Sequence, residues 1–114
     1  MKGNTIFYVN FEDERIPEDK IILSDLISVV KKKTNAEKVL LMLDEIQRMP
    51  EWSRWVRRIF DSTNYSLIVT GSTSKLVGYR LPSSLAGRTI SIIVLPLRFI
   101  DFFCVLRVTK KLIN

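Results

Sequence analysis

The sequence predicts an α/β fold built on a mainly parallel sheet. Apolar segments of strand length alternate along the chain with longer segments of helical periodicity, in the order β-α-β-α-β-(α)-β-α. The segment 38–43 is apolar at successive positions, which is typical of a strand covered on both faces inside an α/β sheet. Both observations indicate helices packed against parallel strands.

Length and composition limit the class of protein. The chain has 114 residues, 46% of them apolar, so it is one domain or part of one with a real core. Its one cysteine, Cys104, excludes an internal disulfide framework and suits a reducing cytoplasm. The longest apolar stretch, residues 90–108, is interrupted by proline and charged residues, whereas a membrane span needs about 20 apolar residues. We expect a soluble, cytoplasmic protein.

The positive charge is concentrated near the C-terminus. Residues 1–74 hold 11 basic and 11 acidic residues, whereas residues 75–114 hold 7 basic residues and only Asp101 as an acid, so the whole net charge of +6 lies there. Such a basic end could contact phosphates of a nucleotide or a nucleic acid. A solvated basic tail explains the same pattern.

Four segments have the composition of strands. They are rich in β-branched and aromatic residues and are bounded by polar residues, glycine or proline. The predicted strands are residues 5–11, 38–43, 65–70 and 89–97.

Two amphipathic helices are predicted between the first three strands. The first, residues 17–33, carries an apolar stripe made by Ile21, Ile22, Leu26, Val29 and Val30. The second begins near Pro50, and its apolar face is made by Trp52, Trp55, Val56, Ile59 and Phe60. A short helix or turn is expected at residues 74–77, and a further helix begins in "RFIDFFCVL", residues 98–106.

Three of the predicted strands end in polar residues. The pairs Glu12-Asp13 and Asp44-Glu45 follow two of them, and Thr70-Gly71-Ser72 ends the third. Ligands of open parallel sheets gather at the carboxyl ends of the strands. We therefore expect these side chains to share one edge of the sheet.

An apolar strand that ends in Asp-Glu is the Walker B pattern of P-loop ATPases. In that pattern Asp44 is a ligand of Mg²⁺, and Glu45 polarises the water that attacks the γ-phosphate. A strand end suits both roles because the oxygen atoms must be held at fixed distances. The structural alternative is that one of these acids caps the helix that opens near Pro50.

Polar residues after the next strand extend the pattern. Thr70 and Ser72 are candidates for sensing the γ-phosphate, and Gly71 allows close approach of the backbone. Arg88, in "LAGR", is a candidate for stabilising charge at the transferring phosphate, in its own subunit or across an interface. The alternatives are an ordinary strand-to-helix turn and a surface arginine.

Five motifs together resemble a prokaryotic group of AAA-type ATPases: "FYVNFED", "LLMLDEIQRMPEW", "IVTGSTSKL", "LAGR" and "IIVLPLRFIDFF". The resemblance covers residues 5–104 and implies ATP and Mg²⁺ as cofactors. It matches Asp44 and Glu45 to Walker B, Ser72 to the sensor position, and Arg88 to the basic residue of the "L-x-G-R" box. It implies a structural role for Gln47 and Trp52.

The phosphate-binding loop of this family, G-x-x-x-x-G-K-[ST], is absent from the 114 residues. The resemblance therefore implies a partial three-layer P-loop NTPase-like fold, in which the sheet lacks the P-loop strand that separates the "TGS" strand from the 89–97 strand. We expect an incomplete ATPase core over residues 1–104 and a basic tail over residues 105–114. Such a core fragment should hydrolyse little ATP alone, and its open strand edges should favour self-association.

Two other functions fit the sequence. One is a non-catalytic interaction module that pairs with a complete ATPase through the open edge. The other is a small basic nucleic-acid-binding protein that uses residues 75–114.

Overall fold

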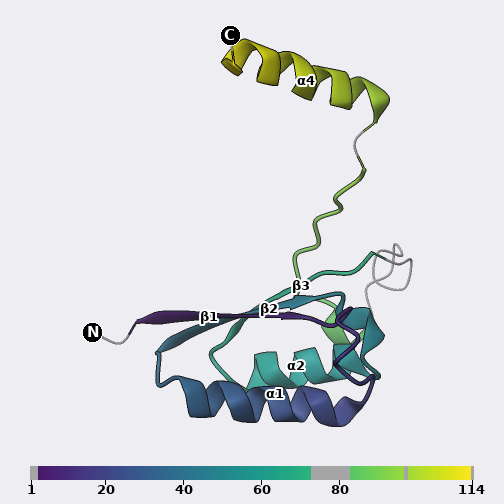
Figure 1. The fold of residues 1–114 in the computed structure, drawn as a ribbon. Helices are drawn as coiled ribbons and strands as arrows, with labels where there is room; N and C mark the ends of the chain where they lie inside the picture. The colour runs from purple at the N-terminus through teal and green to yellow at the C-terminus, as the bar shows by residue number, and fades with distance from the viewer. Residues whose placement is uncertain (1–2, 73–82, 97, 114) are drawn as a thin grey trace.

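A three-stranded parallel sheet with two helices on one side forms the body of the protein (Figure 1). The computed structural model describes residues 3–72, 83–96 and 98–113. The strands are β1 (Asn4–Asn10), β2 (Lys38–Asp44) and β3 (Ser66–Val69), in the order β1-β2-β3. The predicted α/β class and parallel sheet are confirmed. The predicted turn at residues 74–77 lies outside the described residues.

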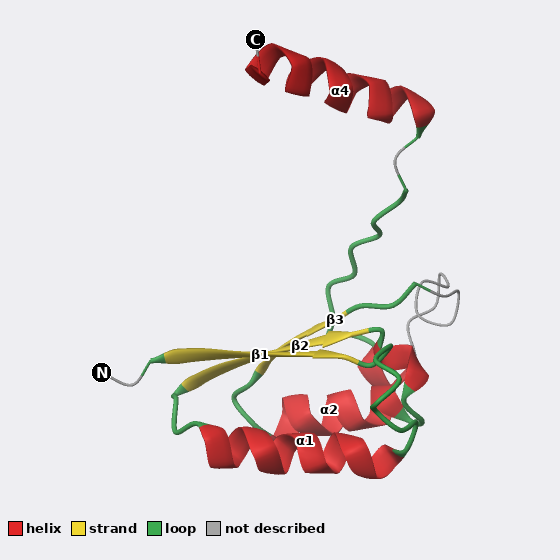
Figure 2. Ribbon diagram, viewed as in Figure 1, coloured by secondary structure: helices red, strands yellow, loops and turns green. Residues whose placement is uncertain are grey.

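The helices α1 (Lys20–Lys33) and α2 (Trp52–Ser62) both pack on the same side of the sheet (Figure 2). Each helix links one strand to the next parallel strand in the same direction along the sheet. Right-handed crossovers place two such helices on one face. The other face is therefore left without a helix in the described part of the body, and we call it the outer face.

The first helix begins later and faces the sheet differently than predicted. Asp19 ends the preceding turn, and its carboxylate accepts a hydrogen bond of 3.0 Å from the backbone N–H of Ile21, so the helix starts at Lys20 rather than at residue 17. The predicted stripe is partly wrong, because Ile21 and Val29 are exposed. The helix is apolar on more than one side, and the sheet covers the line made by Leu23, Ile27 and Val30.

The core lies between the sheet and these two helices. From β2, Val39, Leu41 and Leu43 point into it at alternate positions, as the pleat of a strand requires. The second helix contributes the centre of its predicted face, Trp55, Val56 and Ile59, whereas Phe60 is half-exposed. Four further residues complete the core: Phe11 and Met49 from loops, Ile46 from the 3-10 helix η1 (Ile46–Arg48) and Leu85 from the 3-10 helix η2 (Ser83–Leu85).

The prediction of a fourth strand at residues 89–97 is wrong for the part that the structure describes. Residues 89–96 pair with no strand there and are exposed. Strand composition alone does not make a strand, since the backbone groups need a neighbouring chain to pair with. In the described sheet, the edge of β3 away from β2 carries no such neighbour.

A further helix, α4 (Phe99–Ile113), follows this extended segment and stands apart from the sheet (Figure 1). The predicted helix start near residue 98 is confirmed. The Asp101 carboxylate accepts hydrogen bonds from the Arg98 backbone N–H at 3.1 Å and from its guanidinium Nε at 2.9 Å, which fixes the first turn. The helix continues to residue 113, so most of the segment expected as a basic tail is helical.

Candidate functional site

Asp44 and Glu45 lie at the carboxyl end of β2, next to the end of β3. Asp44 is opposite Asn10 of β1 in the sheet register, so the ends of the strands lie level. Two hydroxyl-bearing residues, Thr70 and Ser72, follow β3 at the same edge. The predicted meeting of these four residues at one edge is what the geometry shows.

The Asp44 carboxylate accepts two hydrogen bonds from neighbouring strands. The Thr70 hydroxyl donates to Oδ1 at 2.5 Å, and the Tyr8 hydroxyl donates to Oδ2 at 2.6 Å. Both bonds, that of Thr70 first, hold the pKa of Asp44 below its usual value, because they stabilise the charged form. The Asp44 carboxylate is therefore held in one orientation, and its charged form is favoured.

Thr70 holds the chain around both acids. Its hydroxyl also accepts a hydrogen bond of 3.3 Å from the backbone N–H of Glu45. Its backbone N–H donates to the Leu43 carbonyl at 3.0 Å, and its carbonyl accepts from the Ile46 N–H at 3.2 Å. The end of β3 thus clamps residues 43–46 beyond the last regular strand pair.

Glu45 is held by side chains from two directions. The Ser72 hydroxyl donates to Oε2 at 3.0 Å, and the Gln47 side-chain amide donates to the same oxygen. The backbone of Glu45 is left-handed, with φ of 55°, which costs a non-glycine residue about 1–2 kcal/mol. Strain of this kind is concentrated at functional sites.

The alternative in which Asp44 or Glu45 caps the helix that opens near Pro50 is wrong. Glu45 precedes the short 3-10 helix η1 (Ile46–Arg48) without a side-chain capping bond. Glu51 occupies the residue before α2, also without such a bond. The carboxylates of Asp44 and Glu45 instead accept hydrogen bonds from side chains of other segments.

All the residues of this site lie in a segment that matches a known protein family. The profile described as "AAA domain" matches residues 1–103. The chain belongs to the AAA domain family. The AAA family in general uses ATP and Mg²⁺.

Three curated relatives of this AAA domain are all named only as uncharacterised proteins. One from Methanocaldococcus jannaschii is 38% identical over 96 residues, which cover 83% of this chain and 21% of the relative. One from Haemophilus influenzae is 32% identical over 102 residues, covering 88% and 25%. The AAA domain described here thus spans about a fifth to a quarter of the length of these relatives. No solved structure matches the chain.

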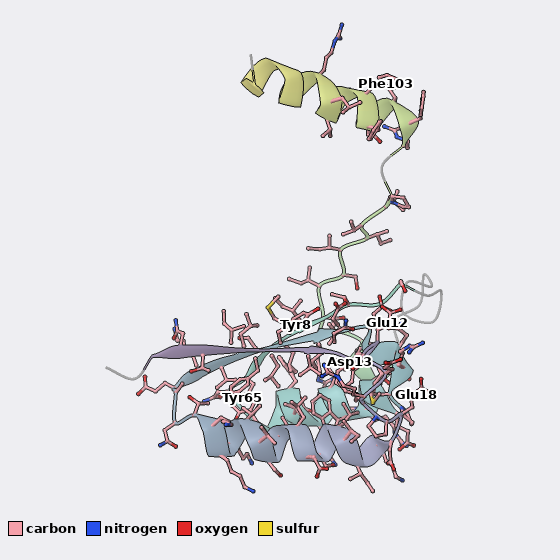
Figure 3. The ribbon with its side chains drawn as sticks, viewed as in Figure 1. Tyr8, Glu12, Asp13, Glu18, Tyr65 and Phe103 are labelled. Atoms are coloured by element: carbon pink, nitrogen blue, oxygen red, sulfur yellow. The ribbon has the colours of Figure 1, made fainter. Side chains whose placement is uncertain are left out.

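Tyr8 is a member of the site that the sequence did not indicate. Tyr8 lies opposite Met42 in the register of β1 and β2, and Met42 is two residues before Asp44. The Tyr8 side chain reaches Asp44 diagonally across the outer face of this AAA domain. Figure 3 shows its label on the side of the sheet away from α1 and α2. Strand alternation alone could not reveal the contact, because the register between β1 and β2 had to be known.

Gln47 also has a more direct contact than the sequence indicated. Its amide N–H bonds Glu45, while its amide oxygen, Oε1, is buried without a partner among the described atoms. A buried acceptor without a partner is costly. The residue therefore orients the Glu45 carboxylate at some expense to stability.

Arg88 and the acids after β1 do not join the cluster. The guanidinium of Arg88 lies 3.5 Å from the carboxylate of Asp61, near the end of α2. Asp13 pairs with Arg15 at 2.7 Å, which lowers the pKa of Asp13 to about 2. Glu12 is exposed. Among the described residues, the hydroxyls of Thr70 and Ser72, which follow β3, therefore bond the acids at the end of β2 and not those after β1.

The Asp44 carboxylate of this AAA domain can be compared with what a Mg²⁺ ion needs from a protein. Among the described residues, no group of three or more His, Cys, Asp or Glu could hold a metal ion. Mg²⁺ in phosphate-transfer sites usually takes one or two carboxylates and completes its coordination with water and substrate phosphate. One oriented, ionised aspartate fits that need.

No helix in the described residues is long and apolar enough to cross a membrane.

Proposed function

We propose that this chain carries the Walker B half of an AAA-type nucleotide site. Asp44 is the metal ligand, Glu45 the acid that activates water, and Thr70 and Ser72 the residues that sense the γ-phosphate. The observation that supports this most strongly is the pairing across two strand ends: Thr70 holds Asp44, and Ser72 holds Glu45.

The hydrogen bonds leave room for a ligand. Each carboxylate oxygen can accept more than one hydrogen bond or metal contact, so the bonds from Thr70 and Tyr8 orient Asp44 without using all its lone pairs. A bound Mg²⁺ would neutralise charge on the phosphates. The low pKa of Asp44 keeps it ionised and ready for such a cation.

The orientation of Glu45 depends on a residue, Ser72, that a bound γ-phosphate would contact. Ser72 bonds the same carboxylate oxygen that Gln47 bonds, so a phosphate that drew the Ser72 hydroxyl away would change how Glu45 is held. A general base must lie within hydrogen-bond reach of the water it deprotonates. We infer that Ser72 holds Glu45 in an inactive orientation until a γ-phosphate accepts its hydrogen bond.

The phosphate cradle has to come from another segment, because the 114 residues contain no P-loop. In the described sheet, the edge of β3 is unpaired and lies next to Thr70 and Ser72. A parallel strand added at that edge would end beside them. Without it, the activity of this chain is latent.

Arg88 fits a role across a subunit interface better than one within its own subunit. Arg88 pairs with Asp61, which lies in the last turn of α2, shortly before the amino end of β3. Asp44 lies at the opposite edge of the sheet, at the carboxyl end of β2. We propose that Arg88 contacts the phosphate that is bound by a neighbouring subunit.

A second candidate, the interaction module, is favoured by the same unpaired edge of β3. It predicts that the chain binds a complete ATPase of this family without adding turnover. The ATPase core predicts instead that a supplied P-loop segment creates turnover that depends on Glu45.

Paramagnetic broadening by Mn²⁺ tests the proposed metal ligand. We expect Mn²⁺ to broaden the backbone NMR signals of Glu45 and Thr70 in the full chain, and Asp44→Asn to abolish this. Asp13→Asn is the matched control, since Asp13 is an aspartate in a neighbouring loop that pairs with Arg15. Broadening that survives Asp44→Asn, or that Asp13→Asn abolishes, would reject Asp44 as the ligand.

A further inference from the structure

A pocket of about 430 Å³ lies between α1 and α2, near the N-terminal ends of both helices. The two helices contact each other on one side of the sheet (Figure 2). Small-molecule sites in proteins usually have volumes of about 300–1,000 Å³. None of the residues around Asp44 that form the proposed nucleotide site lines this pocket. It is therefore a separate candidate site.

The wall of this pocket is positively charged. Its described basic residues are Lys20, Arg54 and Arg58, and its described acid is Glu51. Glu51 pairs with Arg54 at 3.6 Å, but their side chains are 60% and 79% exposed, so the pair contributes little free energy. Lys20 and Arg58 form no ion pair within the part of the chain that the structure describes. Two cations are therefore available for an anionic ligand.

Both helices begin beside this pocket with a positive charge. Lys20 is the first residue of α1 and Arg54 lies in the first turn of α2, and neither first turn contains an acidic residue. A cation at the N-terminus of a helix opposes the helix dipole, which favours anions there. Glu51, which precedes α2, makes no side-chain capping bond to that helix. An anion in the pocket would lower the free energy of both helix ends.

The pocket also has an apolar wall. Leu23 is 1% exposed and Trp55 is 6% exposed, so both line the pocket while they belong to the core. The indole Nε1–H of Trp55 is buried without an acceptor among the described atoms, and a buried donor without a partner is costly. A ligand that brought an acceptor to this ring would remove that cost. The lining therefore suits a ligand that has an apolar body as well as a charge.

We propose that this pocket binds a small organic anion, with its charged group between Lys20 and Arg58 and its apolar body against Leu23 and Trp55. The lining supplies a partner for each of these two parts. Carboxylates and phosphate monoesters share this chemistry, and titration with one of each separates them. The proposal does not depend on the nucleotide site around Asp44.

NMR titration of the full chain tests the pocket, with the indole N–H signal of Trp55 as the reporter. Trp52→Phe removes the other indole signal and so assigns that of Trp55. We expect phenylacetate, phenyl phosphate or both to shift the Trp55 signal saturably, and the tighter ligand identifies the charged group. Phenylacetamide, which lacks the charge, and inorganic phosphate, which lacks the apolar body, should bind more weakly. Binding of phenylacetamide as tight as that of both anions would reject the proposal.

Substitution of the charged residues shows whether the anion lies in this pocket. Arg58→Gln should weaken binding about fivefold, as expected for the loss of one exposed ion pair. Glu51→Gln should strengthen binding, because it removes the described acid of the wall. Arg57→Gln is the matched control, since Arg57 is exposed on the same helix but pairs with Asp61 at 3.6 Å and does not line the pocket. No saturable shift with either anion, or equal weakening by Arg58→Gln and Arg57→Gln, would overturn the proposal.

Discussion

The hydroxyl of Tyr8, on β1, donates a hydrogen bond of 2.6 Å to Asp44, which ends the neighbouring strand β2. Thr70, after β3, donates to the other oxygen of the same carboxylate at 2.5 Å. Three strands therefore converge on one aspartate. This convergence orients the carboxylate and favours its charged form, which are the two properties that a ligand for a divalent cation needs.

Removing either hydroxyl should raise the pKa of Asp44 towards its ordinary value of 3.8. Thr70→Val should raise it more than Tyr8→Phe, because the hydrogen bond from Thr70 is the larger cause of the lowering. Carbon-detected NMR titration of the Asp44 carboxyl group measures this. Tyr65→Phe is the control, since Tyr65 precedes β3 and its label lies on the helix side of the sheet (Figure 3). Equal titration in all four proteins would contradict the assignment.

The same hydrogen bonds predict a loss of stability in acid. The folded pKa of Asp44 lies below the unfolded one, so its contribution is fully present above the unfolded value and is lost as the pH falls through the folded value. Asp44→Asn should therefore cost about 1 kcal/mol of unfolding free energy at pH 7 and less at pH 3. Urea unfolding at the two pH values checks this. A difference that grows in acid would reverse the predicted sign.

Gln47→Met should change stability little while releasing Glu45. The substitution removes one hydrogen bond to Glu45, but it also removes the buried amide oxygen that has no described partner. We expect the two effects to offset each other to within about 0.5–1 kcal/mol in urea unfolding. Gln47→Glu is the contrasting variant, because it places a second negative charge beside Glu45 and should destabilise clearly. A large loss with Gln47→Met would show that the amide does more than hold Glu45.

The two sides of β2 should differ sharply in their tolerance of alanine. Leu41 is 0% exposed in the core, so Leu41→Ala should cost about 2–5 kcal/mol. Leu40 is adjacent but points to the outer face and is partly exposed, so Leu40→Ala should cost less. Thermal or urea unfolding compares the pair. Equal costs would mean that the outer face is as tightly packed as the helix side.

The isolated chain should hydrolyse ATP no faster than its Glu45→Gln variant. The acids and hydroxyls are present, but the sequence contains no P-loop to supply backbone donors and a lysine to the phosphates. Phosphate release with and without Mg²⁺ measures turnover, with a P-loop ATPase as positive control. Magnesium-dependent hydrolysis that Glu45→Gln abolishes would show that the chain forms a complete site.

The sequence predicted the parts of this protein that depend on short-range patterns. Apolar runs and helical periodicity located β1, β2, β3, α1 and α2 to within a few residues, and the acids at the end of β2 followed directly. Because parallel strands end at a common edge, the meeting of Thr70 and Ser72 with those acids could also be predicted.

The tertiary structure decided everything that depends on a long-range partner. The register of the strands brings Tyr8 within hydrogen-bond distance of Asp44. Packing against the sheet determines which of the apolar sides of α1 is buried. Residues 89–96 have strand composition but are not a strand, because no neighbouring chain pairs with them in the described sheet. A local pattern specifies what a segment can form, whereas hydrogen-bond partners and covered surfaces come from segments distant in the chain, and only the folded arrangement supplies them.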